Sequence, residues 1–141
     1  MSTSPLVISS CGARKAPAAC SAGSLYTGSY ARMCLRAARA LAADSDIRIL
    51  SARHGLLGLD REVQPYDTRL SSRDAITADR LRAQAADDGL LHRPVIVLAG
   101  SAYTALVRQV WTEVTTPLAG LPGMGAHLAR LADIATTKAL S

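Results

Sequence analysis

Three short, mainly aliphatic runs constrain the fold of this chain more than any other feature of its sequence. They span residues 6–9, 47–51 and 94–100, and each ends in a turn of small or polar residues. Apolar runs of this length are typical of strands that are buried on both faces. Helical patterns separate the runs, and strands that alternate with helices form parallel sheets. The sequence therefore predicts an α/β fold, with residues 1–141 forming one small three-layer domain in which helices flank a mostly parallel central sheet.

The helices are predicted from apolar residues that recur every three or four positions. In the clearest helix, over 28–43, one face carries Tyr30, Met33, Cys34, Ala37, Ala38 and Leu41. Ser72, followed by Arg73 and Asp74, is a typical helix start and predicts a helix over 72–88 that ends near Gly89. A third helix follows Gly100 and Ser101, with Tyr103, Leu106, Val107, Val110 and Trp111 on its apolar face. The apolar face of a predicted terminal helix carries Met124, Leu128, Leu131, Ala132 and Ala135. We expect residues 52–70 and 117–125 to be irregular connections.

Composition excludes several classes of protein. With 49% hydrophobic and 19% charged residues, the chain is not intrinsically disordered. It has neither an apolar run of about 18 residues nor a signal peptide's basic start, so we expect a cytoplasmic protein with no membrane partner. Cys11, Cys20 and Cys34 match neither zinc pairs nor a disulfide framework, so no metal and no cofactor are expected. His92 and His127 are expected to be solvated.

The charge balance favours anionic partners. Sixteen Lys and Arg residues against 11 Asp and Glu give a net charge of +5, and only Lys15 and Lys138 are lysines. Arginine suits bidentate contacts to phosphate, so a nucleotide or nucleic-acid substrate is expected. Heavy use of arginine and alanine is also typical of a GC-rich genome, and that interpretation stays open. The sequence leaves the oligomeric state open.

Small, polar or titratable residues stand at the ends of all three predicted strands: Ser9, Ser10, Cys11, Gly12 and Lys15; Ser51, Arg53, His54 and Gly55; Gly100 and Ser101. In open α/β sheets, ligands bind beyond the carboxyl ends of the strands. We therefore expect these loops to form one pocket, although polar loops are common in any protein. Standard catalytic signatures are absent, including the P-loop, the dinucleotide fingerprint and the nucleophile elbow. A cysteine-phosphatase loop is excluded because Pro17 stands where its arginine is needed.

Two segments resemble a family of small uncharacterised bacterial and phage domains. One is Ser-Cys-Gly-Ala-Arg-Lys at 10–15 with Leu-Tyr-Thr-Gly at 25–28; the other is Ile-Leu-Ser-Ala-Arg-His-Gly-Leu-Leu at 49–57 with Pro-Tyr-Asp at 65–67. The resemblance covers residues 7–70 and 95–125. More distantly, the first part is similar to YaaA-type peroxide-stress proteins, and the strand before Gly-Ser-Ala-Tyr at 100–103 is similar to uracil-DNA-glycosylase-type α/β domains. The resemblance implies a domain type without fixing its activity.

The residue types in these segments suit an enzyme that cleaves or exchanges an N-glycosidic bond. The Cys11-Gly12 backbone and Lys15 are a candidate phosphate nest, and Tyr26 and Tyr66 are candidates for stacking on a base. His54 is the candidate acid for the departing base, and Asp67 is the candidate carboxylate for an oxocarbenium-like transition state. For each, a structural role is the alternative: a buried turn cysteine, a loop histidine and an Asx turn.

Two other functions stay open from the sequence. One is a non-catalytic nucleic-acid-binding domain that uses the arginines of helix 72–88, although Arg73, Arg80 and Arg82 interleave with acidic residues that cancel much of their charge. The other is a thiol enzyme with Cys11 as its nucleophile, for which a helix N-terminus near the turn would lower the thiol pKa.

Overall fold

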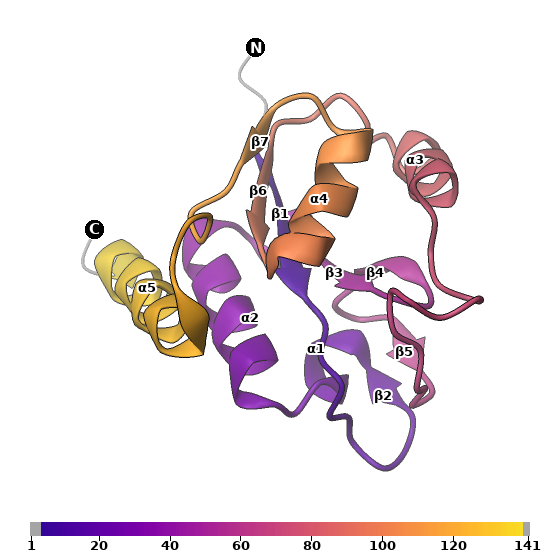
Figure 1. Cartoon of the computed structure of the whole chain (residues 1–141), viewed down its shortest axis with the longest axis horizontal. Coiled ribbons are helices and arrows are strands. Elements are labelled where there is room, and N and C mark those ends of the chain that lie inside the picture. Colours follow the sequence, from indigo (N-terminus) through magenta and orange to yellow (C-terminus); the bar gives the residue numbers. More distant parts are fainter. Residues whose placement is uncertain (1–3, 140–141) are drawn as a thin grey trace.

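A five-stranded sheet lies at the centre of the computed structural model, which describes residues 4–139 (Figure 1). The strand order is β4-β3-β1-β6-β7. Four strands are parallel: β1 (Leu6–Ser10), β3 (Ile47–Ser51), β6 (Val95–Leu98) and β7 (Val114–Thr115). β4 (Gly55–Gly58) pairs antiparallel with β3 at the edge of the sheet. The predicted mostly parallel sheet is therefore confirmed, and β7, only two residues long, extends it beyond the three predicted strands.

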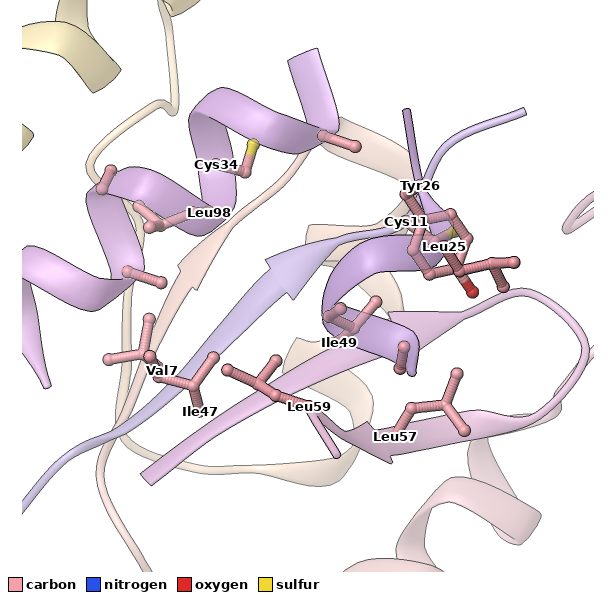
Figure 2. Packing of buried hydrophobic residues seen from close by; sticks show 14 of the residues in the cluster. Val7, Cys11, Leu25, Tyr26, Cys34, Ile47, Ile49, Leu57, Leu59 and Leu98 are labelled. Atoms are coloured by element: carbon pink, nitrogen blue, oxygen red, sulfur yellow. The ribbon is translucent and has the colours of Figure 1, made fainter. Parts of the chain in front are cut away.

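Helices cover both faces of this sheet, which confirms the three-layer arrangement. α2 (Ser29–Leu41) and α5 (Gly123–Ala139) lie on one face, and α3 (Ala78–Asp87) and α4 (Ser101–Val110) lie on the other (Figure 1). Alternate strand residues serve the two layers: Val7 and Ile49 join the core under α2, shown in Figure 2, whereas Ile8 and Leu50 join the core under α3 and α4. Full burial of each such side chain stabilises the fold by about 1.5–3 kcal/mol.

A smaller unit lies beyond the carboxyl end of β1. β2 (Cys20–Ser21) pairs antiparallel with β5 (Glu62–Val63), and the short helix α1 (Ala22–Leu25) follows β2 (Figure 1). Backbone hydrogen bonds fix α1 to the segment before β5, from Ala22 N to Arg61 O at 2.7 Å and from Gly23 N to Leu59 O at 3.0 Å. The loops after β1 and after β4 are thereby joined. A short 3-10 helix, η1 (Asp44–Asp46), leads from the α2 side into β3.

The prediction that residues 52–70 form an irregular connection is wrong at two places, because β4 and β5 lie within it. Leu56 and Leu57 are both buried, one in each core. Successive side chains of a strand point to opposite faces of the sheet, so adjacent residues of β4 can be buried in different cores. Gly55 opens β4 with a φ of 75°, in the left-handed region that favours glycine. Two apolar residues between glycines are too few for the sequence pattern to predict a strand here.

The predicted helix over 72–88 starts later than expected. α3 begins at Ala78, and Thr77 is its N-cap, with its side chain accepting a hydrogen bond from Arg80 N at 3.2 Å. Ser72 instead closes a turn by accepting from Arg69 N at 3.0 Å. A helix capped by Ser72 would need the Ile76 amide to donate to Ser72 O, but that amide donates to Ala52 O at 2.7 Å. The predicted end near Gly89 is confirmed by the left-handed φ of 69° at that glycine.

α5 packs on α2 through the fully buried Leu131 and through a polar contact that the sequence did not indicate. His127 Nδ1 and Tyr30 Oη form a hydrogen bond of 2.9 Å, so the prediction of a solvated His127 is wrong, whereas His92 is exposed as predicted. Met124, in the first turn of α5, is 58% exposed and does not join the core as predicted. Among the helices of residues 4–139, none is both long and apolar enough to cross a bilayer.

Candidate functional site

The carboxyl ends of β1 and β3 lie side by side, and the segments that follow them build the candidate site. The strand register pairs Ser10 with Leu50, so that the start of the Cys11 loop adjoins Ser51. Fold topology thereby brings together two of the predicted strand ends, as expected for an α/β sheet.

A chain of hydroxyl groups forms the centre of this edge. Tyr26 Oη and Tyr66 Oη form a hydrogen bond of 2.5 Å, and Ser51 Oγ donates to Tyr66 Oη at 2.6 Å. Ser51 is fully buried and Tyr26 is 5% exposed. Burial raises the pKa of Tyr26 to about 12 and raises the pKa of Tyr66 further. Both phenols are therefore protonated at neutral pH, and the three linked hydroxyl groups form an uncharged network of donors and acceptors.

His54 lies next to this network. Its backbone N–H donates to Ser51 Oγ at 3.0 Å, and its ring meets the Tyr66 ring edge-on, with 5.2 Å between the ring centroids. Burial lowers the pKa of His54 below 6.5, and the positive charges of Arg53, Arg61 and Arg80 lower it further. The imidazole is therefore neutral near pH 7. A neutral imidazole accepts a proton readily, which differs from the purely acidic role predicted from the sequence.

Gln84 of α3, which the sequence gave no reason to select, holds the turn that carries His54. Its Nε2 donates to His54 O at 2.7 Å, and its Oε1 accepts from Leu56 N at 2.9 Å. The side-chain amide also lies where a Cβ at Gly55 would be, so this position admits no side chain without a shift of Gln84. Gln84 thus fixes both ends of the turn.

Lys15 covers the network from the loop after β1. Its Nζ lies 4.3 Å from the centroid of the Tyr66 ring and 5.8 Å from that of Tyr26, within the range of cation–π attraction. It also donates to Ala13 O at 3.2 Å. The backbone of Lys15 forms a β-bridge with Tyr26, which brings this cation to the site.

Cys11 joins the site to α4. Its Sγ donates to Tyr103 Oη at 3.2 Å, and the residue is only 8% exposed. Figure 2 shows Cys11 and Tyr26 at the same end of the core. A buried thiol that donates to a phenol fits the structural alternative better than a nucleophile does. Gly12, the other member of the predicted nest, packs against α2, where a Cβ would meet the Ala31 side chain at 3.4 Å.

Two cavities adjoin the tyrosine pair. The first, of about 430 Å³, is lined by Arg53, His54, Leu57, Arg61, Glu62, Val63, Gln64, Pro65 and Tyr66; we call it the His54 cavity. The second, of about 820 Å³, is lined by Ser10, Tyr26, Ser24, Ser29, Arg32, Arg36, Arg39 and neighbouring apolar residues; we call it the α2 groove. A hydrogen bond joins Tyr26, which lines the α2 groove, to Tyr66, which lines the His54 cavity, and we call this pair the boundary between them. Of the predicted site residues, His54 and Tyr66 line the first cavity, and Ser10 and Tyr26 line the second.

Of the predicted site residues, only His54 and Tyr66 line the His54 cavity; Asp67, Gly100 and Ser101 are among those that do not. Asp67 directly follows Tyr66 but is exposed and does not line the cavity. Gly100 is the N-cap of α4. Ser101 lines a different cavity, of about 410 Å³, together with Thr104, Arg108 and His127 among others. Within the His54 cavity, the charged lining residues that sequence reasoning missed are Arg61 and Glu62, which lie in the segment predicted to be irregular.

The arginines of the predicted helix 72–88 do not form a phosphate-binding stripe. Arg73 lies ahead of α3. Arg82 pairs with Asp79 at 3.1 Å and donates to Gln109 O at 2.7 Å, which commits its guanidinium to contacts within the chain. The geometry therefore disfavours nucleic-acid binding through α3.

No group of three or more His, Cys, Asp or Glu side chains within residues 4–139 is placed to hold a metal ion. The thiols of Cys11, Cys20 and Cys34 are all free, and Cys11 and Cys34 are buried.

Comparison with known proteins places the chain in a family without assigning it an activity. No curated protein matches it. The model of a family of unknown function, DUF6884, matches residues 6–133, which is nearly the whole chain, and the protein therefore belongs to that family.

Proposed function

We propose that this protein is an enzyme of nucleotide or nucleic-acid metabolism that cleaves or exchanges an N-glycosidic bond in the His54 cavity. One observation carries the proposal: a neutral imidazole, an aromatic ring and two guanidinium groups line one cavity at the carboxyl edge of the sheet. Arginine is the side chain best suited to phosphate, and the cavity's volume of about 430 Å³ lies in the usual range for small-ligand sites. The resemblance of the segment around residues 100–103 to uracil-DNA-glycosylase-type domains, noted from the sequence alone, suggests the same class of reaction.

The chemistry assigned to His54 is proton transfer. In hydrolysis, a water oxygen forms a bond to the anomeric carbon while the bond from that carbon to the base nitrogen breaks, and the electron pair of the broken bond leaves with the base. Neutral His54 accepts a proton from the water and returns a proton to the base nitrogen. A lowered pKa suits the first of these transfers, because the imidazole is unprotonated when the water arrives.

A carboxylate is needed to stabilise the positive charge that develops on the sugar. Two residues of the segment 62–67 are candidates. Asp67 is the one predicted from the sequence, and Glu62 lines the His54 cavity directly. Arg53 and Arg61, which line the same cavity, are assigned to the phosphate.

The test begins with a thermal-shift screen of purine and pyrimidine nucleotides and short oligonucleotides. A ligand at about 100 times its Kd adds about 2.7 kcal/mol of stability. Single-turnover release of base is then measured for His54→Ala, Asp67→Asn and Glu62→Gln, with His92→Ala as the matched control because His92 is exposed.

We expect His54→Ala to lose about 10²- to 10⁴-fold in rate, with a smaller loss for bases that depart without a proton. One of the two carboxylate variants should lose rate without losing affinity, because its interaction exists mainly in the transition state. The control should keep its rate. Failure of the wild-type chain to release base from any substrate, or equal losses in His54→Ala and His92→Ala, would overturn the proposal.

A further inference from the structure

We propose that the α2 groove binds the phosphodiester backbone of a single-stranded nucleic acid, so that the substrate is a polymer strand and not a free nucleotide. The reaction performed on the strand rests on the proposed function above. The binding itself rests only on the charge, shape and position of the groove.

The charge of the groove comes from α2. Arg32, Arg36 and Arg39 stand at positions i, i+4 and i+7, which share one face of a helix, and all three line the groove. No carboxylate is among its lining residues. The three positions span about 10 Å along the helix axis, more than one phosphate group covers, which favours a chain of phosphates. Arg39 also pairs with Asp44 at 3.2 Å, but both side chains are exposed and such pairs are weak, so all three arginines can contribute; the test below replaces the first two.

The shape of the groove favours a single strand. It is a concave space of about 820 Å³ between α1 and α2, with the hydroxyl groups of Ser24 and Ser29 on its wall. A duplex is read by a helix or ribbon that projects into it, whereas a single strand lies in a positively charged groove of the protein. The α2 groove is a positively charged concave space of this kind, and therefore suits a single strand.

The position of the groove connects it to the His54 cavity. Tyr26 lines the groove, Tyr66 lines the His54 cavity, and their hydroxyls are 2.5 Å apart. Lys15 lies over the same two rings and continues the positive charge across the boundary. A strand whose phosphates lie along α2 is thereby held beside the cavity that would take one of its nucleotides.

The experiment is a salt titration of binding to a fluorescent single-stranded oligonucleotide of about ten nucleotides, measured by anisotropy. The test variant is Arg32→Gln with Arg36→Gln. The matched control is Arg69→Gln with Arg73→Gln, which removes the same charge from exposed positions on another part of the surface. A third variant, Arg32→Lys with Arg36→Lys, keeps the charge. Circular dichroism checks that all of them fold.

We expect the test variant to make the slope of log K against log salt shallower by about 1.4, and to bind about 25-fold more weakly at about 0.1 M salt, since each phosphate contact to a single strand contributes about 0.7 to that slope. The control should keep the wild-type slope, and the lysine variant most of it. Equal losses in the test and control variants would overturn the proposal, because binding would then be diffuse.

Competition separates the polymer from smaller phosphates. We expect a nucleoside monophosphate or triphosphate to displace the oligonucleotide only at far higher concentration. Displacement by the triphosphate at a similar concentration, with the same dependence on Arg32 and Arg36, would overturn the proposal in favour of a compact polyphosphate. Two outcomes separate this proposal from the proposed function. Binding that depends on Arg32 and Arg36, without any base release, defeats the proposed function alone. Base release that the test variant leaves unchanged, with equal binding losses in the test and control variants, defeats the groove alone.

Discussion

Ser51 organises the candidate site through a single buried hydroxyl group. Its Oγ donates to Tyr66 Oη at 2.6 Å and accepts from Arg53 N at 3.1 Å and His54 N at 3.0 Å. The last residue of β3 therefore fixes both the turn that carries His54 and the tyrosine that packs on the histidine ring.

Ser51→Ala is expected to destabilise the fold by about 1–3 kcal/mol, because two amides and a phenol lose their partner in a partly buried place. The measurement is the free energy of unfolding from urea denaturation. Ser71→Ala, at an exposed position, is the control and should change that energy by less than about 0.5 kcal/mol. Equal stability of the two variants would show that Ser51 does not hold the turn.

At the level of single residues, the sequence predicts which residues lie near the candidate site, but not the contacts between them. Ser51, His54 and Tyr66 lie within sixteen positions of one another after one strand, so their proximity follows from local order. The pairing of Cys11 with Tyr103 joins residues 92 positions apart, and only the packing of α4 on the sheet creates it. The lowered pKa of His54 has the same origin, because burial and the distant Arg80 contribute to it.

At the level of elements, the start of α3 shows how tertiary contacts choose between two good caps. Ser72 and Thr77 are both residue types that favour an N-cap. The hydrogen bond from Ile76 N to Ala52 O attaches the chain to the β3–β4 turn and delays the helix until Ala78. The hydrophobic periodicity of the following residues is unchanged by this shift, so the predicted end remained correct while the predicted start did not.

Thr77→Ala is therefore expected to cost about 1 kcal/mol of stability, since Arg80 N loses the side chain that caps it. Ser72→Ala should cost less than half as much, because Ser72 closes only an exposed turn. Urea denaturation of the two variants, with far-ultraviolet circular dichroism for helix content, measures the difference. The opposite order of stabilities would mean that the helix starts at Ser72 in solution.

At the scale of the whole molecule, the alternation of strands and helices predicted the layers and the sheet edge that carries the candidate site, but not the cavities. The His54 cavity depends on Arg61 and Glu62, which reach it because β5 pairs with β2 some forty residues earlier in the chain. The α2 groove depends on how α1 stands against α2. Both are spaces between elements, and hydrophobic periodicity describes only the faces that elements bury.

The tyrosines give a test of the packing of the whole molecule. All four have pKa values raised by burial, that of Tyr26 to about 12 and those of Tyr30, Tyr66 and Tyr103 further. The folded state therefore favours the neutral phenol over the phenolate. This contribution to stability is fully present below pH 10, the ordinary pKa of tyrosine, and is lost as the pH rises above it.

We expect phenolate formation and unfolding to occur together in an alkaline titration. Near-ultraviolet absorbance of the phenolate should stay low as the pH passes 10, and should then rise in step with the loss of the far-ultraviolet dichroism signal. The chain denatured in urea, as the control, should titrate near pH 10, because its tyrosines are exposed to solvent. Phenolate that forms with a midpoint near pH 10 while the dichroism stays constant would show that the Tyr26–Tyr66 pair is not buried, and the boundary between the two cavities would have to be redrawn.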